Sequence, residues 1–246
     1  MPRTLVAIPA LNESATIGAV IADVRRAAPT AAILVVDDGS TDGTDAVAGA
    51  AGALVVRLAF NVGVGGAMRA AFLYALTEDF DAVVQVDADG QHVAAHIDDL
   101  VAALSRASVV VGARFADGYQ VRGPRRLAMQ TLARSLSRVC RTTLTDTTSG
   151  FRAADRRAIA LFAAHYPAEY LGDTVESLVL AARAGLTVTE VPVRMRPRQG
   201  GRPSQSPGRS VLYLGRALLA LYVSLARRPV PAPQARPGMP SAVGQP

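Results

Sequence analysis

Continuous apolar runs alternate with segments of helical periodicity along most of the chain, and this alternation limits the possible folds more than any other feature. The apolar runs predict strands at residues 5–10, 33–36, 54–56, 82–84, 108–111 and 188–193. The helical patterns predict helices at residues 15–28, 61–77, 127–141 and 173–184. Strands that are apolar throughout are typical of a parallel sheet covered by helices on both faces. The sequence therefore predicts an α/β fold.

Polar and glycine-rich motifs follow several of the predicted strands. They occupy residues 11–14, 37–44, 61–67 and 85–92. In an open α/β sheet, ligands bind at the carboxyl ends of the strands, where such motifs would come together. The pattern therefore indicates a binding site built from several loops at one edge of the sheet.

The motif after the strand at 82–84 carries two carboxylates, Asp87 and Asp89, followed by Gly90. Side chains two residues apart on an extended segment point the same way, so the two carboxylates could converge on one ion. Hard oxygen ligands suit Mg²⁺ or Mn²⁺, and Mg²⁺ is usually held by one or two carboxylates plus substrate phosphates. The motif thus points to a nucleotide diphosphate. An ordinary polar turn is the alternative, since Asp and Gly are common in turns.

Short motifs recur along the chain in a particular order. They are Pro9-Ala10 with Asn12-Glu13, Val36-Asp37-Asp38-Gly39-Ser40-Thr41-Asp42-Gly43-Thr44, Asn61-x-Gly63, Asp87-x-Asp89-Gly90-Gln91-His92, Gly112-x-Arg114 and Ser149-Gly150-Phe151-Arg152. In this order they resemble the motifs of family 2 glycosyltransferases with the GT-A fold, above all those of dolichol- and polyprenol-phosphate mannosyl- or glucosyltransferases. The resemblance covers about residues 4–222. It implies a Rossmann-like three-layer α/β/α fold with a mostly parallel central sheet.

The resemblance implies how the nucleoside of a donor is bound. Glu13 and Asp38 match positions that contact the nucleoside, where a carboxylate can accept from a base N–H or a ribose hydroxyl. Asp37 matches a carboxylate that supports the loop, so it ranks below Asp38. The other matched substrate-binding positions on this side are Pro9, Ala10, Asn12, Gly63 and Ala88.

The resemblance also implies how the diphosphate is held. Asp87, Asp89 and Gln91 match the metal and diphosphate ligands, with Asp89 and Gln91 as the expected direct ligands of Mg²⁺ or Mn²⁺. Arg114 and Arg125 match cations placed against phosphates, and a planar guanidinium suits bidentate phosphate binding. A solvated basic face is the alternative for the cluster around Arg125.

The second half of the chain is expected to bind the acceptor. Arg152 would meet an acceptor phosphate or, in the alternative interpretation, only fix its loop. Glu176 matches an acid near the site, although with the Asp three residues earlier it also fits a helix capping box. The basic loop at residues 198–204 resembles family loops that close over the diphosphate. Arg198, as a catalytic cation, and Arg202 would join the site when substrate is bound.

The chain departs from the family pattern at a few positions. Leu11 stands where an aromatic residue is common, and Ser14 where a second acid is usual, so contacts near the base would differ. Ala71 replaces a frequent Gly, and Val93 a frequent Pro. None of these changes removes a charge that the chemistry needs.

The sequence lacks a complete motif for three other kinds of ligand site: a dinucleotide site, a Walker A phosphate loop and a zinc site. The glycine-rich segment at 63–68 has Met68 where a dinucleotide fingerprint needs a small residue, and it follows the third strand rather than the first. No Gly-Lys-Ser/Thr tripeptide of a Walker A loop is present. His92 and His96 have no third partner that would complete a zinc site.

Composition fits one globular unit. A chain of 246 residues with 50% hydrophobic content can bury a full core. We expect one domain at 1–208, with a nucleotide-sugar half at 1–115 and an acceptor half at 116–208. A single Cys, Cys140, excludes an internal disulfide and suits a reducing compartment. The N-terminus lacks a signal-peptide pattern, so the expected location is the cytoplasm.

The net charge of +6 and the pI near 10.2 indicate an anionic partner. Basic segments without interleaved aromatic residues argue against nucleic acid, whereas an anionic membrane surface fits the charge. Residues 209–228 fit an interfacial amphipathic helix at the cytoplasmic face of a membrane, or else a helix packed on the domain. The Pro-rich tail at 229–246 is expected to be disordered.

The resemblance, which the metal motif and the positive charge support, implies a metal-dependent inverting glycosyltransferase that moves a sugar from a GDP- or UDP-hexose to a polyprenyl phosphate. An acceptor phosphate is already anionic near neutral pH, which fits the lack of an obvious general base. One alternative is the same fold with a soluble acceptor. The other is a non-catalytic protein that binds nucleotide sugars or associates with a membrane. The sequence carries no signal for an oligomeric state.

Overall fold

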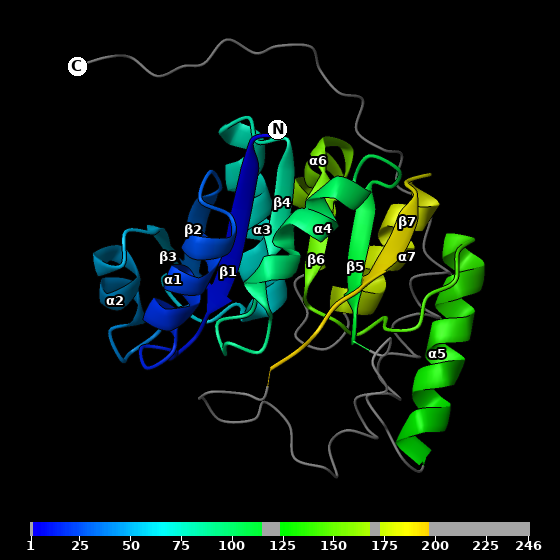
Figure 1. Cartoon of the computed structure of the whole chain (residues 1–246), viewed down its shortest axis with the longest axis horizontal. Coiled ribbons are helices and arrows are strands. Elements are labelled where there is room, and N and C mark those ends of the chain that lie inside the picture. The colour runs from blue at the N-terminus through cyan, green and yellow to red at the C-terminus, as the bar shows by residue number, and fades with distance from the viewer. Residues whose placement is uncertain (1, 115–123, 168–172, 197–246) are drawn as a thin grey trace.

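The computed structural model describes residues 2–114, 124–167 and 173–196, with side chains for all of these except 124–128. One sheet of seven strands runs through this part of the chain, in the spatial order β3-β2-β1-β4-β6-β5-β7 (Figure 1). The strands are β1 (Thr4–Ala10), β2 (Ala32–Asp37), β3 (Leu54–Arg57), β4 (Ala82–Gln85), β5 (Val109–Ala113), β6 (Arg152–Asp155) and β7 (Val188–Pro192). All neighbouring strands are parallel except where β6 is involved. The predicted α/β fold with a mostly parallel sheet is confirmed.

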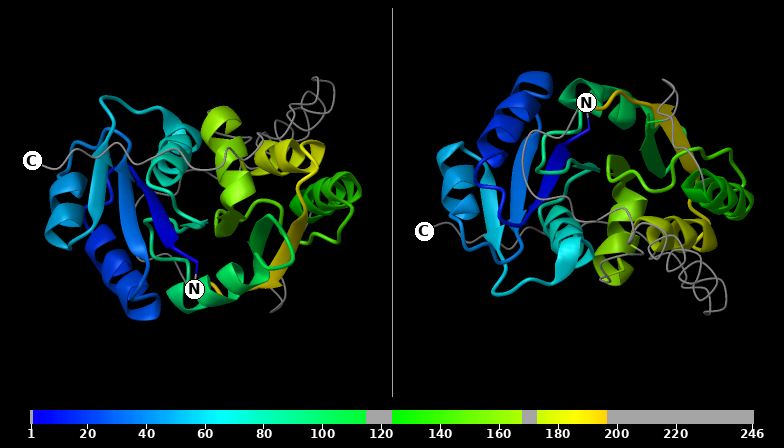
Figure 2. Two further views of the ribbon diagram at one scale, coloured as in Figure 1. Left: turned by 90° about the horizontal axis from the view of Figure 1, so that it is seen from above. Right: turned by 90° about the horizontal axis from the view of Figure 1, so that it is seen from below.

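Helices cover both faces of this sheet (Figure 2). They are α1 (Ile17–Ala27), α2 (Thr44–Ala50), α3 (Gly63–Thr77), α4 (Ile97–Ala103), α5 (Pro124–Cys140), α6 (Arg156–His165) and α7 (Asp173–Arg183), with a short 3₁₀ turn η1 (Ala94–His96). Leu5 and Ala7 of β1 pack toward α3, α5, α6 and α7. Val6 and Ile8 pack toward α1, α2 and α4. Alternate side chains of one fully buried strand thus enter two cores, which explains its continuous apolar run.

Strand β6 is antiparallel to both of its neighbours, β4 and β5. Residue Gln85 at the carboxyl end of β4 pairs with Arg152 at the amino end of β6. Because β6 runs in the opposite direction, the motif at 146–152 arrives at the same edge of the sheet as the motif at 85–92. The topology therefore brings the predicted donor and acceptor motifs together.

Every predicted strand and helix within the described residues is present, with ends shifted by a few residues. Helices α2, α4 and α6 were not predicted, and neither was β6. In the described ranges, no helix is long and apolar enough to cross a membrane. The predicted loop at 198–204, the helix at 209–228 and the tail at 229–246 lie outside these ranges.

Candidate active site

Hydrogen bonds link the loop after β1 to the loop after β2. Asn12 adopts a left-handed backbone conformation with φ 54°. Its backbone N–H donates to Ser40 Oγ at 2.9 Å, and its side-chain Oδ1 accepts from the backbone N–H of Thr41 at 2.9 Å. The backbone N–H of Glu13 donates to Thr44 Oγ1 at 2.9 Å. These bonds explain why a polar motif follows each strand, because the two loops supply each other with hydrogen-bond partners.

The residues predicted to contact the nucleoside lie at the ends of strands β1 and β2. Pro9 is partly buried and Ala10 is buried at the end of β1, where the carbonyl of Ala10 accepts from Asp38 N at 2.8 Å. The Glu13 carboxylate is partly buried and accepts from Thr16 Oγ1 at 2.9 Å. These residues therefore lie together at the carboxyl edge of β1 and β2, as the sequence predicts.

Asp37 and Asp38 at the end of β2 differ in their hydrogen-bond partners. Asp38 is 4% exposed, and its two carboxylate oxygens accept from the backbone N–H groups of Val62 and Gly63 at 2.8 and 2.9 Å. Burial raises the pKa of Asp38, against the effect of these two N–H donors. Asp37 is fully buried, and its Oδ1 accepts from Ser40 N at 3.0 Å. Asp38 therefore caps the start of α3, an internal role that the sequence analysis did not predict for it.

The loop from Asp87 to His92 turns sharply at Gly90, which has φ 75°. Asp89 is 6% exposed and accepts at Oδ1 from the backbone N–H of Gln91 at 3.0 Å. The Asp87 side chain is more open, with 39% exposure. Ala88 between them is buried. The structure thus brings the predicted ligands Asp87, Asp89 and Gln91 into one short loop at the sheet edge.

Three neighbours surround the carboxylate of Asp87. Gln85 Nε2 donates to Oδ1 at 3.4 Å, and His92 Nε2 lies 3.5 Å from Oδ2. Gly150 lies directly against the carboxylate, because a Cβ at this position would be 2.9 Å from both oxygens. The acceptor-side motif therefore contacts the donor-side motif at Gly150. Any side chain at position 150 would displace the carboxylate of Asp87.

The donor set in this loop suits a hard divalent cation, because it offers carboxylate and amide oxygens. Among the described residues, no group of three or more His, Cys, Asp or Glu side chains could hold a metal ion by itself. An ion shared between this loop and substrate phosphates fits that arrangement, whereas a closed protein cage does not. Asp87, Asp89 and Gln91 are the residues that would hold it.

Arg114 at the end of β5 forms a two-point ion pair with Asp146. Its Nε donates to Asp146 Oδ2 at 2.5 Å and its Nη2 donates to Oδ1 at 2.9 Å. Nη2 also donates to Thr148 Oγ1 at 2.9 Å. Asp146 is fully buried, so this pairing neutralises a buried charge. The sequence analysis placed Arg114 against a phosphate, whereas the described contacts give its guanidinium a protein partner.

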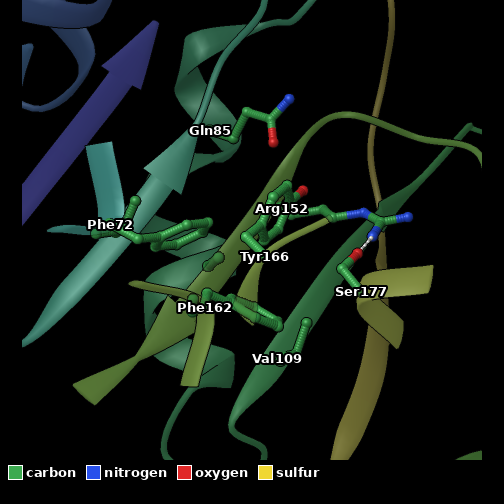
Figure 3. A pocket seen from close by; sticks show the side chains of 10 residues that line it. Phe72, Gln85, Val109, Arg152, Phe162, Tyr166 and Ser177 are labelled. Carbon is green, nitrogen blue, oxygen red and sulfur yellow. Dashed lines mark hydrogen bonds between the residues drawn. The ribbon is translucent and has the colours of Figure 1, made fainter. Parts of the chain in front are cut away.

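Arg152 at the start of β6 is buried and donates to four protein acceptors. These are Ser149 O, Thr174 O, Ser177 Oγ and Thr147 O, at 2.7 to 3.0 Å. Figure 3 shows the bond to Ser177. The structure therefore favours the loop-fixing alternative for Arg152 over contact with an acceptor phosphate. A guanidinium carries five N–H donors, and the protein itself uses nearly all of them.

Sequence reasoning missed a buried acid, Asp173, at the start of α7. Desolvation raises the pKa of Asp173 to about 6, although the nearby charge of Arg152 acts in the opposite direction. Burial also raises the pKa of Tyr166, with the charge of Asp173 adding to the effect. Tyr166 lines a small cavity with Gln85, Arg152 and Ser177 (Figure 3). Asp173 had appeared only as a possible helix cap, because nothing in the sequence reports its burial.

Of the remaining predicted site residues, two are described completely, and three are described in part or not at all. Gly63 begins α3 and Glu176 lies partly buried on α7. Arg125 falls in α5, but its side chain lies outside the described residues, as do Arg198 and Arg202 altogether.

Comparison with known proteins adds an independent result. The family model for glycosyl transferase family 2 matches residues 5–162. An undecaprenyl-phosphate mannosyltransferase of Micrococcus luteus is 34% identical over 217 residues, which are 84% of this chain and 88% of that protein. A polyprenol monophosphomannose synthase of Mycolicibacterium smegmatis is 31% identical over 210 residues, covering 81% and 79% of the two chains.

Solved structures share the fold. The glucosyl-3-phosphoglycerate synthase of Mycobacterium tuberculosis, in complex with phosphoglyceric acid, aligns with a TM-score of 0.70 at 22% identity, over 95% of this chain and 82% of that one. Another structure of that enzyme, with a TM-score of 0.68, contains Mn²⁺, uridine diphosphate and glucosyl-3-phosphoglycerate. The predicted GT-A-like three-layer arrangement is therefore confirmed.

Proposed function

Because the chain belongs to glycosyl transferase family 2 and is a glycosyltransferase, we propose that it transfers a hexose from a nucleoside diphosphate sugar to a polyprenyl phosphate, with inversion at the anomeric carbon. The observation that carries the proposal is the loop of Asp87, Asp89 and Gln91 at the carboxyl edge of the sheet, in contact with the acceptor-side motif at Gly150. The acceptor class is supported by two relatives named for undecaprenyl phosphate and polyprenol, each more than 30% identical over most of its length.

The donor would lie along the edge formed by β1, β2 and β4. The loops that Asn12 ties together, with Asp37 and Asp38 behind them, would form the nucleoside side of the site. Asp87, Asp89 and Gln91 would hold Mg²⁺ or Mn²⁺. When bound, this ion would neutralise the negative charge that develops on the leaving diphosphate. The fold neighbour that contains Mn²⁺ and uridine diphosphate supports such a site.

The acceptor would approach from the side of residues 146–152. Arg152 and the Arg114–Asp146 pair hold this segment rigid beside Asp87. A phosphate monoester is anionic near neutral pH, so it can attack without a strong general base. Positioning of the two substrates would then account for much of the rate enhancement.

The test is a transfer assay with the purified full chain. A panel of GDP- and UDP-hexoses would be supplied with Mn²⁺, Mg²⁺ or a chelator, and polyprenyl phosphate or phosphoglycerate would serve as the acceptor. We expect label from one donor to enter the organic phase only with polyprenyl phosphate and metal. Transfer to phosphoglycerate alone would favour the soluble-acceptor alternative, and no transfer from any donor would favour a non-catalytic protein.

A matched pair of variants links the assay to the site. Asp89→Asn should abolish transfer, since it removes a charged ligand at the loop. Asp98→Asn replaces an exposed acid on α4 and should leave transfer unchanged. Near-normal turnover of Asp89→Asn at saturating metal would contradict the assigned metal site.

A further inference from the structure

The chain that follows β7 is tied to the loop at residues 87–91, here called the metal loop. After β7, the edge strand of the sheet, the chain crosses back to this loop at the end of β4 (Figure 1). The backbone N–H of Arg196 donates to the carbonyl of Gln91 at 2.8 Å. Beside this bond, His92 and Met195 form an isolated antiparallel bridge. The backbone after β7 therefore lies along the end of the metal loop.

The backbone of Gln91 is held on both sides. Its N–H donates to Asp89 Oδ1 at 3.0 Å, and its carbonyl accepts from Arg196. A displacement of Arg196 would move the Gln91 backbone and, through it, a hydrogen-bond partner of the Asp89 carboxylate. Asp89 and Gln91 are the expected direct ligands of the ion. Two hydrogen bonds thus link the position of Arg196 to that of both ligands.

The side chain of Arg196 reaches helix α1. Its Nη1 donates to Asp23 Oδ2 at 2.8 Å, and the two side chains are 40% and 23% exposed. Burial acts to raise the pKa of Asp23, but hydrogen bonds from Arg196 and Arg26 lower this pKa overall, so the carboxylate is charged near neutral pH. Arg196 therefore connects α1 to the metal loop, with its side chain bound to one and its backbone to the other.

Close packing alone does not hold the metal loop against α1 at this point. A small cavity lies between them, and its lining includes Asp23 of α1, Gly90 of the loop, and Arg196. Groups that line a void lack partner atoms on that side and lose the corresponding packing contacts. The polar contacts of Arg196 beside the cavity therefore supply a restraint that packing does not.

From these contacts we infer that Arg196 is a positioning residue: its ion pair with Asp23 anchors the chain after β7, and its backbone N–H thereby fixes the metal loop in the geometry that binds the ion and diphosphate. The inference rests on the proposed function of the loop. It extends that function by assigning a task in the reaction to an ion pair outside the set of expected ligands.

Four variants test the ion pair. Asp23→Asn and Arg196→Gln each remove one charge and keep a side chain of similar size, and a double variant combines them. Arg196→Lys keeps a cation at the same position. The matched control is Arg26→Gln, because Arg26 Nη2 donates to the other oxygen of Asp23 at 3.1 Å from a side chain that is 74% exposed.

The readout is the affinity of the full chain for Mn²⁺, measured by electron paramagnetic resonance with uridine diphosphate or guanosine diphosphate. Each variant is first checked for a cooperative melting transition. We expect Asp23→Asn and Arg196→Gln each to weaken Mn²⁺ binding roughly 3- to 10-fold, and the double variant to bind no more weakly than either, because the two residues act through one contact. Arg196→Lys should retain part of the affinity, and Arg26→Gln should match the parent.

The sign of the two effects separates anchoring from a long-range charge effect. Asp23→Asn removes a negative charge and Arg196→Gln a positive one, so electrostatics through space would change the Mn²⁺ affinity in opposite directions. Loss of the anchor would lower the affinity in both variants. A role in stability alone would lower the melting temperature of the variants and leave their Mn²⁺ affinity unchanged.

Three results would overturn the inference: parental Mn²⁺ affinity in the two folded single variants, shifts of opposite sign, or losses that add in the double variant. Transfer by the parent, measured in parallel, tests the proposed function separately. Affinities in the expected order, with a parent that transfers no sugar, would support the inference and refute the proposed function. An active parent with unaffected variants would refute only the inference, and a parent that binds no Mn²⁺ with either diphosphate would refute both.

Discussion

Carboxylates at the sheet edge have the same chemistry but different surroundings. Asp38 is buried against two backbone N–H groups, Asp87 is partly open, and Asp173 is buried beside Arg152. Burial disfavours the charged form of an acid, whereas N–H donors and nearby cations favour it. The same side chain can therefore serve as a helix cap, a candidate ligand or a group that retains its proton.

Gly150 should be sensitive to the smallest substitution. In Gly150→Ala, the new Cβ would lie 2.9 Å from both oxygens of Asp87, so the carboxylate must shift. We expect kcat/KM for transfer to fall on the order of 100-fold with little change in melting temperature, because small displacements of reacting groups are costly. The control is Gly49→Ala on α2, where a Cβ meets nothing within 4 Å. Parental kcat/KM in Gly150→Ala would show that the position of Asp87 does not matter.

Asp173 should make stability depend on pH. Its folded-state pKa of about 6 is above the model-compound value of 3.8, so between these values the folded protein holds a proton that the unfolded chain has released. The resulting stabilisation is fully present below about pH 3.8 and is lost as pH rises through about 6. In the parent, the free energy of unfolding should fall between pH 5 and 8, and in Asp173→Asn this fall should be smaller by about 1 kcal/mol, measured by urea titration. An unchanged pH slope would contradict this assignment.

At the scale of elements, helix α3 begins on a carboxylate from another strand. The first N–H groups of a helix have no partner within the helix, and Asp38 accepts from two N–H groups at this helix start, those of Val62 and Gly63. Asn61 Oδ1 also accepts from the backbone N–H of Gly63, at 2.9 Å, so the helix start has a local partner as well. Asp38 is distant in sequence, and a local search around 61–63 does not find it. The end of β2 and the start of α3 are thereby fixed to each other beneath the nucleoside side of the site.

Asp38→Asn should therefore affect stability as well as donor binding. An amide offers only one acceptor for two N–H groups, so one of them would face an NH₂ group. We expect a loss of about 1 to 3 kcal/mol in the free energy of unfolding by urea, together with a higher KM for the donor. Asp99→Asn, on the exposed face of α4, should change neither quantity by a comparable amount. A raised KM without any loss of stability would show that Asp38 acts on the nucleoside alone.

Elements were predictable where their pattern was long or strongly apolar. The runs in β1, β2 and β5 and the long helix α3 were found for this reason. Strand β6 was missed because its four residues, Arg-Ala-Ala-Asp, contain no large apolar side chain. Its strand conformation comes from pairing on both sides with β4 and β5, which is a tertiary effect.

The motifs of the candidate site could be predicted from the sequence, but the contacts that each of its residues makes were harder to predict. The sequence correctly indicated that the motifs at 11–14, 37–44, 61–67 and 85–92 would lie at one edge of the sheet, but not that β6 would bring 146–152 to the same edge. It did not reveal that the Arg152 guanidinium would donate to protein acceptors, or that His92 Nδ1 would accept from the backbone N–H of Asp87. Such duties depend on burial and on partners far apart in the chain, and residue spacing carries neither.

At the scale of the whole molecule, the excess of positive charge bears on where the enzyme works. The net charge is +6, and a polyprenyl phosphate would be presented in a membrane. We expect the full chain to sediment with vesicles containing anionic lipid, to release as ionic strength is raised, and to ignore neutral vesicles. Absence of binding to anionic vesicles at low salt would argue against a peripheral membrane location.

The position of β6 has a consequence for how this sheet can be divided. Strands β4 and β5 precede residue 115, yet in the sheet formed by the described residues β6, at Arg152–Asp155, lies between them and pairs with both. A fragment ending at 115 would lack the strand between them, so we expect it to show no cooperative melting when produced alone. The donor and acceptor motifs would then open and close as one cooperative unit. Acceptor preference in such an enzyme would have to diversify by substitution in place, and not by exchange of a detachable half.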